Sequence, residues 1–181
     1  MHDHVSIQHD FNFSEILEIP SDGRSGGIAI MWMHNMITVD EVVREDQELY
    51  AMIKVIPNQN PWLVSTIYAS TDSYEHKLMW YNLTNIYEKY KVPWLVIGDF
   101  NDVFSSEEKW GGRPVNFNKT TKLWNLVKSC ELFDLGFKGP KYTWTNYRKR
   151  SKGLIMERLD RCFVNEGWVN QYPNAIVDHL P

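Results

Sequence analysis

The feature that most constrains the fold of this chain is the segment 94–97, Trp-Leu-Val-Ile, in which every residue is apolar. It follows Pro93 and leads directly into Gly98 and Asp99. A short, β-rich and continuously apolar run is typical of a strand that is buried on both faces. Other elements must therefore cover both sides of this strand, which indicates a layered α/β domain.

Four apolar, β-rich runs precede this strand, at residues 28–33, 36–43, 49–56 and 62–68. In the third run Tyr50 and Met52 alternate with Ala51 and Ile53, as expected for a strand with two different faces. The segment 57–61 contains two prolines and two asparagines and predicts a turn. Short connections between successive runs predict an antiparallel meander.

Two helices are predicted. Asp72 and Glu75 have the spacing of a helix N-terminal cap, and an apolar stripe at spacings of four, three and four follows. That stripe consists of Met79, Leu83, Ile86 and Tyr90. A second helix is expected over 118–132, and its inward residues are Leu123, Leu126, Val127 and Cys130. Further strands are expected at 142–146 and 158–164, so the chain is interpreted as one α/β domain over residues 1–181 with mainly antiparallel sheets.

Composition excludes several classes of protein. The apolar share of 43% and the charged share of 23% exclude disorder, collagen and coiled coil. No apolar run reaches the roughly 18 residues of a membrane span, and the first residues do not resemble a signal peptide. The two cysteines, Cys130 and Cys162, exclude a disulfide framework and a cysteine-based zinc site. An intracellular, reducing location is expected.

The charge is unevenly distributed. The segment 138–161 holds eight basic and two acidic residues, a net of +6, whereas the whole chain carries −4. Tyr142, Trp144 and Tyr147 lie among these basic residues. Basic side chains beside aromatic ones can bind the phosphates and bases of nucleic acid. A solvated loop at 147–153 beside a strand explains the same pattern, and the sequence does not distinguish the two.

The strongest chemical signal is the segment 98–102, Gly-Asp-Phe-Asn-Asp, directly after the apolar strand. Polar residues at the carboxyl end of a strand face the crevice in which α/β folds bind ligands. Asp99 and Asn101 are two residues apart and would point to the same side of an extended chain. Such oxygens suit Mg²⁺, which often uses one or two carboxylates and a substrate phosphate. A strand-capping turn rich in Asp and Asn is the alternative.

Two further signals are weaker. Arg158 and Asp160 alternate at the start of an expected strand, where they indicate either a functional pair or an edge-strand ion pair. Tyr68 ends the strand 62–68 and is either a functional residue or part of the core or its rim. His34 and His76 are expected at the surface. No nucleophile elbow, P-loop or dinucleotide-binding fingerprint occurs.

The order of these motifs resembles the endonuclease/exonuclease/phosphatase superfamily, which includes DNase I and the exonuclease III-type abasic-site endonucleases. The resemblance rests on Tyr68-Ala69, Gly98-Asp99-Phe100-Asn101, Tyr142-Thr143-Trp144 and Arg158-Leu159-Asp160. It is closer still to the endonuclease domain of plant LINE-type (non-LTR) retrotransposon polyproteins. That likeness adds Ser25-Gly26-Gly27-Ile28, Glu108-Lys109-Trp110-Gly111-Gly112 and Arg158-Leu159-Asp160-Arg161, and it covers the chain from about Phe11.

The resemblance implies a fold and a reaction. The implied fold is a four-layer α/β sandwich, in which two packed, mainly antiparallel sheets are flanked by helices. The implied reaction is hydrolysis of phosphodiesters with Mg²⁺, for which Mn²⁺ can substitute. Asp99 would orient or deprotonate the attacking water and hold the metal through water, and Asn101 would fix that water and contact the phosphate. Tyr68 would hydrogen-bond the scissile phosphate.

The remaining implied roles lie in the second half of the chain. Asp160 would orient a catalytic histidine, and Thr143, Trp144 and Arg158 would form the DNA-facing wall. The family's metal-binding glutamate lies upstream of the Gly-Gly strand, where this chain has no matching residue. The family's closing Ser-Asp-His-x-Pro is matched only superficially by Asp178-His179-Leu180-Pro181, because Val177 stands in place of serine. We therefore expect that His179 is not the catalytic histidine.

These departures predict a fragment truncated at both ends and therefore an incomplete sandwich. They also predict very weak or no nuclease activity, since groups that act as a unit cannot be half kept. Three functions stay open: a DNA endonuclease-type domain of retrotransposon origin, a catalytically dead nucleic-acid or protein binder, and a phosphatase for small phosphoesters or phosphoinositides. DNA is the expected partner, the chain is expected to be a monomer, and the resemblance implies a nuclear location.

Overall fold

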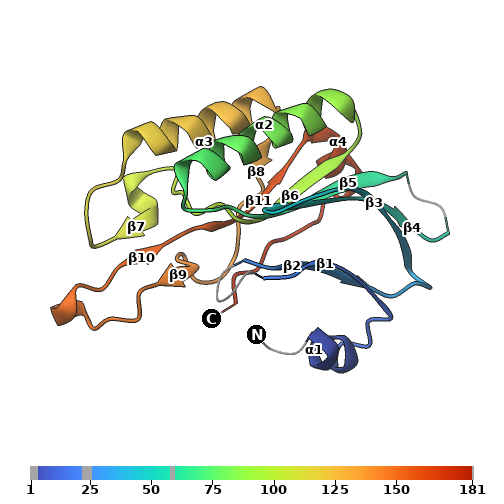
Figure 1. The fold of residues 1–181 in the computed structure, drawn as a ribbon, viewed down its shortest axis with the longest axis horizontal. Helices are drawn as coiled ribbons and strands as arrows, with labels where there is room; N and C mark the ends of the chain where they lie inside the picture. The colour runs from blue at the N-terminus through green and yellow to red at the C-terminus, as the bar shows by residue number, and fades with distance from the viewer. Residues whose placement is uncertain (1–3, 22–25, 58–59, 181) are drawn as a thin grey trace.

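The computed structural model describes residues 4–21, 26–57 and 60–180. Two helices lie on one face of a six-stranded sheet, and a two-stranded sheet lies on the other face (Figure 1). The order of the large sheet is β3-β4-β5-β6-β11-β8. Its strands are β3 (Ile37–Glu45), β4 (Glu48–Val55), β5 (Trp62–Tyr68), β6 (Trp94–Asp99), β11 (Asp160–Val164) and β8 (Phe133–Asp134). All neighbours are antiparallel except β5 and β6, which are parallel.

The helix-covered face forms the main core. Helices α2 (Ser73–Lys89) and α3 (Phe117–Ser129) bury their predicted stripes against residues such as Tyr50, Leu63 and Val96 of the sheet. Asp72 caps α2, because its carboxylate accepts hydrogen bonds from the backbone N–H groups of residues 74 and 75 at 2.9 and 3.1 Å. The capping prediction and both apolar stripes are therefore confirmed.

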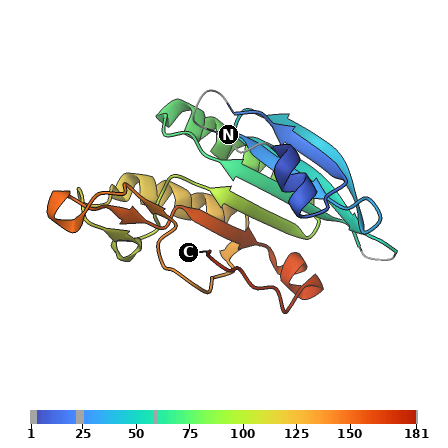
Figure 2. The ribbon, with the colours of Figure 1, turned by 90° about the horizontal axis from the view of Figure 1, so that it is seen from below.

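The opposite face of the large sheet is covered by two separate pieces (Figure 2). Strands β1 (Glu15–Ile19) and β2 (Ile28–Trp32) form an antiparallel pair. They pack over the β3–β5 half, where Leu17 and Ile30 contact a cluster that includes Ala51 and Ile53. Helix α4 (Glu166–Gln171) and the following segment cover the far end of β6 and β11, with Trp168 packed beside Val164.

The remaining elements frame one end of the molecule. A small three-stranded sheet has the order β7-β10-β9, from Lys109–Trp110, Met156–Glu157 and Trp144–Thr145. The hairpin between β9 and β10 carries the 3₁₀ turn η2 (Arg150–Lys152) and extends well away from the large sheet (Figure 1). The 3₁₀ turn η1 (Ser106–Glu108) leads into β7, and the short helix α1 (His4–Asp10) precedes β1.

Several expectations are corrected by this arrangement. The α/β class is confirmed, with helices on one face of the large sheet and a two-stranded second sheet, and a full four-layer sandwich is not observed among the described residues. The expected meander holds for β3, β4 and β5, whereas β2 pairs with the unforeseen β1. The expected turn at 57–61 includes Asn58 and Gln59, and the Gly-Gly motif includes Ser25; these three lie outside the described residues.

The strand that should be buried on both faces is buried on only one. Trp94 and Val96 are 1% exposed on the helix side, but Ile97 on the other side is 38% exposed. The reason is that the two pieces covering this second face do not meet over the end of β6. An uncovered region therefore remains beside Gly98 and Asp99. No helix in the described part of the chain is both long and apolar enough to cross a membrane.

Candidate active site

Three predicted site residues lie side by side at one edge of the large sheet. Tyr68 is the register partner of Asp99 across the parallel β5–β6 pair, and Asp99 is the partner of Asp160 across the antiparallel β6–β11 pair. The carboxyl ends of β5 and β6 thus meet the start of β11. Residues in register on adjacent strands point to the same face of a sheet. The side chains of Tyr68, Asp99 and Asp160 are therefore neighbours on the face that carries β1 and β2.

Backbone geometry at the end of β6 depends on two residue types. Gly98 has φ of +144°, and a Cβ there would overlap the carbonyl of Ile67 in β5, so only glycine fits this close approach. Asn101 has φ of +48°, in the left-handed region that asparagine tolerates better than most residues. The chain is therefore not extended through Asn101, contrary to the geometry assumed from the sequence.

The turn after β6 holds Asn101 next to the other site residues. The Asn101 backbone N–H donates to Oδ1 of Asp99 at 2.8 Å. Its side-chain Nδ2 donates to the carbonyl of Ala69 at 2.5 Å, which joins the ends of β5 and β6. This amide orientation leaves the Asn101 Oδ1 available as an acceptor. Four side chains from three strands and one turn thus converge at one open edge.

Electrostatics distinguish Asp99 within the group. Burial raises the pKa of Asp99 to about 6; the Asn101 N–H that it accepts lowers the pKa, and the nearby Asp160 carboxylate raises it. Asp160 is exposed, and its own backbone N–H donates to Oγ1 of Thr143 at 3.1 Å. The Thr143 hydroxyl also accepts from the Leu159 N–H at 3.0 Å. Thr143 therefore fixes the start of β11, and Trp144 beside it is 42% exposed.

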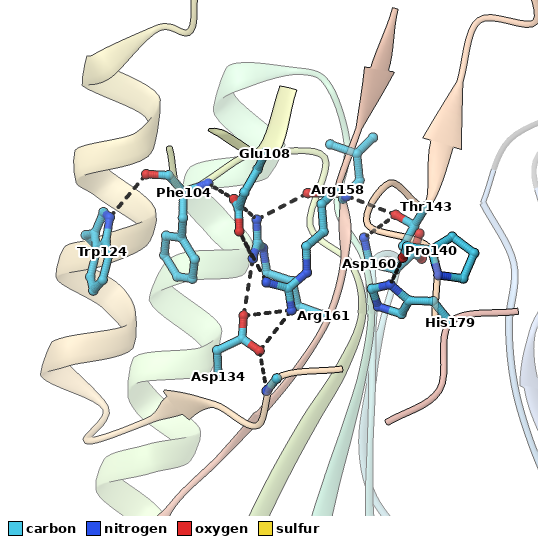
Figure 3. A network of polar contacts seen from close by, with 12 residues as sticks. Phe104, Glu108, Trp124, Asp134, Pro140, Thr143, Arg158, Asp160, Arg161 and His179 are labelled. Carbon is cyan, nitrogen blue, oxygen red and sulfur yellow. Dashed lines mark hydrogen bonds and ion pairs between the residues drawn. The ribbon is translucent and has the colours of Figure 1, made fainter. Parts of the chain in front are cut away.

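Arg158 has a different environment from the one predicted (Figure 3). It precedes β11, is 7% exposed, and donates to Glu108 at 3.2 Å and to Asp134 at 2.9 Å. Arg161 binds the same two carboxylates, at 2.5 and 3.3 Å. Although burial opposes its ionisation, the Arg161 guanidinium holds the pKa of Glu108 below its ordinary value. Both guanidinium groups are thus engaged by buried carboxylates, and substrate binding by Arg158 stays a prediction.

His179 is held by the loop after β8. Its Nδ1 lies 2.9 Å from the carbonyl of Pro140, and its ring stacks on Phe137 with centroids 4.2 Å apart. Figure 3 places it beside Thr143 and Asp160. Within the described residues, however, no hydrogen bond or ion pair joins His179 to Asp160. Its contacts therefore anchor the chain end to the loop at Pro140.

Sequence analysis missed a cleft that opens beside this edge. It has a volume of about 580 Å³ and includes both Tyr68 and Asn101 in its walls. Glu48, at the start of β4, also lines it and is only 1% exposed. Burial raises the pKa of Glu48 to about 8, Asn82 lowers it, and Glu45 raises it. The only sequence signal was a charged residue directly before an apolar strand, which is common in surface turns.

His76 was expected at the surface, and this is wrong. It is 6% exposed on α2, stacks on Trp80, and lies 3.7 Å from the Asp102 carboxylate. Burial lowers the pKa of His76 and raises that of Asp102, so the surroundings favour the uncharged form of each. The apolar stripe of α2 runs past His76, and this helical position could have indicated burial.

The donor set at the edge fits a hard divalent cation. Asp99 and Asp160 offer neighbouring carboxylates and Asn101 an amide oxygen, all ligand types that Mg²⁺ accepts. In the described part of the chain, no group of three or more His, Cys, Asp and Glu side chains is arranged around a potential metal position. A site here would therefore use one or two carboxylates, as Mg²⁺ commonly does beside a phosphate.

The layered α/β fold, with carboxylates, an amide and a tyrosine clustered at one sheet edge, is that of a DNase I-like protein. A family model described as "Endonuclease/Exonuclease/phosphatase family" matches residues 3–179. The chain therefore belongs to the endonuclease/exonuclease/phosphatase family. No curated protein matches it in sequence.

Solved structures agree on the fold. The endonuclease domain of TRAS1, a telomere-specific non-LTR retrotransposon, is similar with a TM-score of 0.65 at 15% identity, over 86% of this chain and 68% of that one. AP endonuclease LMAP from Leishmania major has a TM-score of 0.62 at 12% identity, over 84% and 62%. ANGEL2, a 2′,3′-cyclic phosphatase, has 0.55 at 13% identity, over 92% and 66%. The chain thus spans about two thirds of the length of these structures.

Proposed function

We propose that this chain is a Mg²⁺-dependent phosphodiester hydrolase domain of the DNA endonuclease type, of retrotransposon origin. The observation that carries the proposal is the register that aligns Tyr68, Asp99 and Asp160 at one open sheet edge. Structural similarity to the TRAS1 endonuclease domain supports the retrotransposon assignment. Similarity to an AP endonuclease supports nucleic acid as the substrate.

Asp99 has the properties of a general base in this site. Its pKa of about 6 leaves the carboxylate ionised at neutral pH and still basic enough to take a proton from water. The Asn101 N–H fixes one Asp99 oxygen and leaves the other directed by the same turn. We assign to Asp99 the activation of the water that attacks the phosphorus in line with the leaving oxygen.

The neighbouring side chains would position the phosphodiester. The Tyr68 hydroxyl is a donor that can bind a non-bridging phosphate oxygen, and the Asn101 amide oxygen can orient the attacking water. A divalent cation held by Asp99 and Asp160 would supply positive charge that neutralises the phosphate. Asp160 has no histidine partner in the described residues, and this absence is the basis for expecting low activity.

The β9–β10 hairpin provides a surface for DNA. It carries Arg148, Lys149, Arg150 and Lys152, and Arg150 lies 5.6 Å from the ring of Trp110. Trp144 and the 92% exposed Tyr147 offer rings on which bases can stack. Cationic groups that neutralise phosphates give salt-dependent binding. The hairpin therefore supports a DNA partner, and a nuclear location would follow from that substrate.

A plasmid-nicking assay tests the proposal. The wild-type chain at high concentration, with Mg²⁺ or Mn²⁺, should convert supercoiled plasmid to the nicked form slowly. Asp99→Ala should reduce that rate at least tenfold, because it removes the base and a metal ligand. Asp40→Asn, at an exposed position on β3, is the matched control and should retain the wild-type rate. Equal rates for all three proteins would overturn the hydrolase proposal.

One observation favours a second candidate, a catalytically inactive binding module. His179, the last candidate histidine, is engaged by Pro140 and Phe137 rather than by Asp160. An inactive module would bind DNA through the hairpin without nicking it. Gel-shift titration of the same three proteins separates the two functions, because binding without any Asp99-dependent nicking supports the module alone.

A further inference from the structure

The cleft beside the sheet edge has an unusual charge. Sixteen residues line it, and four of them are acidic: Glu45, Asp46, Glu48 and Glu75. None of these sixteen described residues is lysine, arginine or histidine. Two residues of the proposed active site, Tyr68 and Asn101, belong to the same wall. A phosphate approaching Tyr68 therefore meets a concentration of negative charge that no protein cation offsets.

Glu48 is the innermost of these acidic residues. Its side chain is 1% exposed, and its Oε2 accepts a hydrogen bond from Nδ2 of Asn82 at 2.9 Å. Its Oε1 is buried and has no hydrogen-bond partner among the described residues. Buried polar atoms are normally paired, because an unpaired one costs roughly 1–3 kcal/mol. An unpaired carboxylate oxygen in the wall of an acidic cleft indicates a missing positively charged partner.

The cleft walls are fixed by hydrogen bonds around Gln47. Its Oε1 accepts from the backbone N–H of Ser70 at 2.6 Å, and its Nε2 donates to the carbonyl of Glu75 at 3.1 Å. Its own carbonyl accepts from the Tyr68 N–H at 3.0 Å. Gln47 thus ties β4, the end of β5 and the first turn of α2 together. The position of Glu48 next to it is preorganised before any ligand arrives.

We propose that this cleft binds a hard divalent cation through Glu48, at a site separate from the one formed by Asp99 and Asp160. Carboxylate and amide oxygens are the ligands that Mg²⁺, Mn²⁺ and Ca²⁺ prefer, and Mg²⁺ needs few of them because it keeps several waters. Asn82 orients the Glu48 carboxylate through its Oε2. The more exposed Glu45, Asp46 and Glu75 add attraction at the cleft mouth.

A cation here offsets the repulsion between the cleft and an anionic substrate. It does not depend on the proposed hydrolysis, since the acidic lining and the unpaired Glu48 oxygen are properties of the fold itself. If the chain does act on phosphodiesters, the ion lets a phosphate reach Tyr68 and Asn101 from the side of the cleft. Variants at Glu48 and at Asp99 therefore separate the two ideas.

Binding of Mn²⁺ to the full chain, followed by the electron paramagnetic resonance signal of the free ion, tests the site. Wild type should show a saturable component that Glu48→Gln weakens at least tenfold and Asp99→Asn leaves unchanged. Glu88→Gln, at an exposed position on α2, is the matched control. Loss of binding in Asp99→Asn alone would support the active-site metal and overturn the Glu48 site. Equal binding by wild type and Glu48→Gln would also overturn it.

A second measurement needs no substitution and covers the case in which Glu48→Gln does not fold. Mn²⁺ broadens the NMR signals of nearby nuclei, so substoichiometric Mn²⁺ should selectively broaden the backbone amide signals of Glu48, Gln47 and Asn82 in the wild-type chain. Broadening confined to residues around Asp99 and Asp160, or spread over the whole surface, would refute the cleft site.

Discussion

Replacing Glu48 by glutamine should make the stability of this protein much less dependent on pH. Burial raises the pKa of Glu48 from its ordinary value of 4.5 to about 8. The folded protein therefore holds a proton on Glu48 over a range in which the unfolded chain has lost it. Stability is highest below pH 4.5 with respect to this group, and it falls as the pH rises towards 8.

The size of the effect follows from the two pKa values. Each unit of pKa corresponds to about 1.4 kcal/mol, so ionising Glu48 in the folded state costs on the order of 4 kcal/mol between pH 5 and pH 8. Glutamine has nearly the same volume and no charge. Relative to wild type, Glu48→Gln should thus gain roughly that amount of unfolding free energy at pH 8 compared with pH 5.

Urea unfolding followed by tryptophan fluorescence measures this difference, because eight tryptophans report on the folded state. The experiments are done at pH 5, 6.5 and 8 in EDTA, so that no divalent cation binds. Glu88→Gln should give the same pH profile as wild type. Parallel profiles for Glu48→Gln and wild type, within about 1 kcal/mol, would show that Glu48 is not buried as the structure has it.

Three further outcomes are expected. Gly98→Ala should destabilise the fold by about 3 kcal/mol or more in urea unfolding, because its Cβ would overlap the backbone of β5, whereas Gly136→Ala, with open space around the new Cβ, should cost only about 1 kcal/mol. Arg161→Met should lower stability by about 3–5 kcal/mol, since it removes a guanidinium that pairs with the buried Glu108 carboxylate; an unchanged melting temperature would contradict this. Lys149→Ala should weaken binding to all DNA sequences alike and reduce the slope of log K against log salt by about 1, measured by fluorescence anisotropy.

Local patterns in the sequence determined much of the fold. The period of 3.6 in α2, the Asp72 cap and the alternation in β4 were all predicted, because each depends on residues a few positions apart. The segment 62–68 was predicted with the bounds that β5 has. Glycine at position 98, asparagine at 101 and the aspartate between them marked the end of β6 as the place for chemistry.

Tertiary structure decided which side chains share an environment. The parallel pairing of β5 with β6 and the antiparallel pairing of β6 with β11 brought Tyr68, Asp99 and Asp160 together across 92 residues of chain. Arg158 was assigned to the substrate from its position near Asp160. Its partners Glu108 and Asp134 lie 50 and 24 residues away in sequence, and no local pattern identifies them.

The sequence by itself determined the α/β class, the position of the polar turn at 98–102 and the membership of a nuclease-like family, because these are written in short-range periodicity and in contiguous motifs. Only the packed structure revealed the uncovered region beside Ile97, the burial of His76 and the unpaired oxygen of Glu48. Burial and pairing depend on what lies opposite a residue in space, and that is fixed when distant elements pack together.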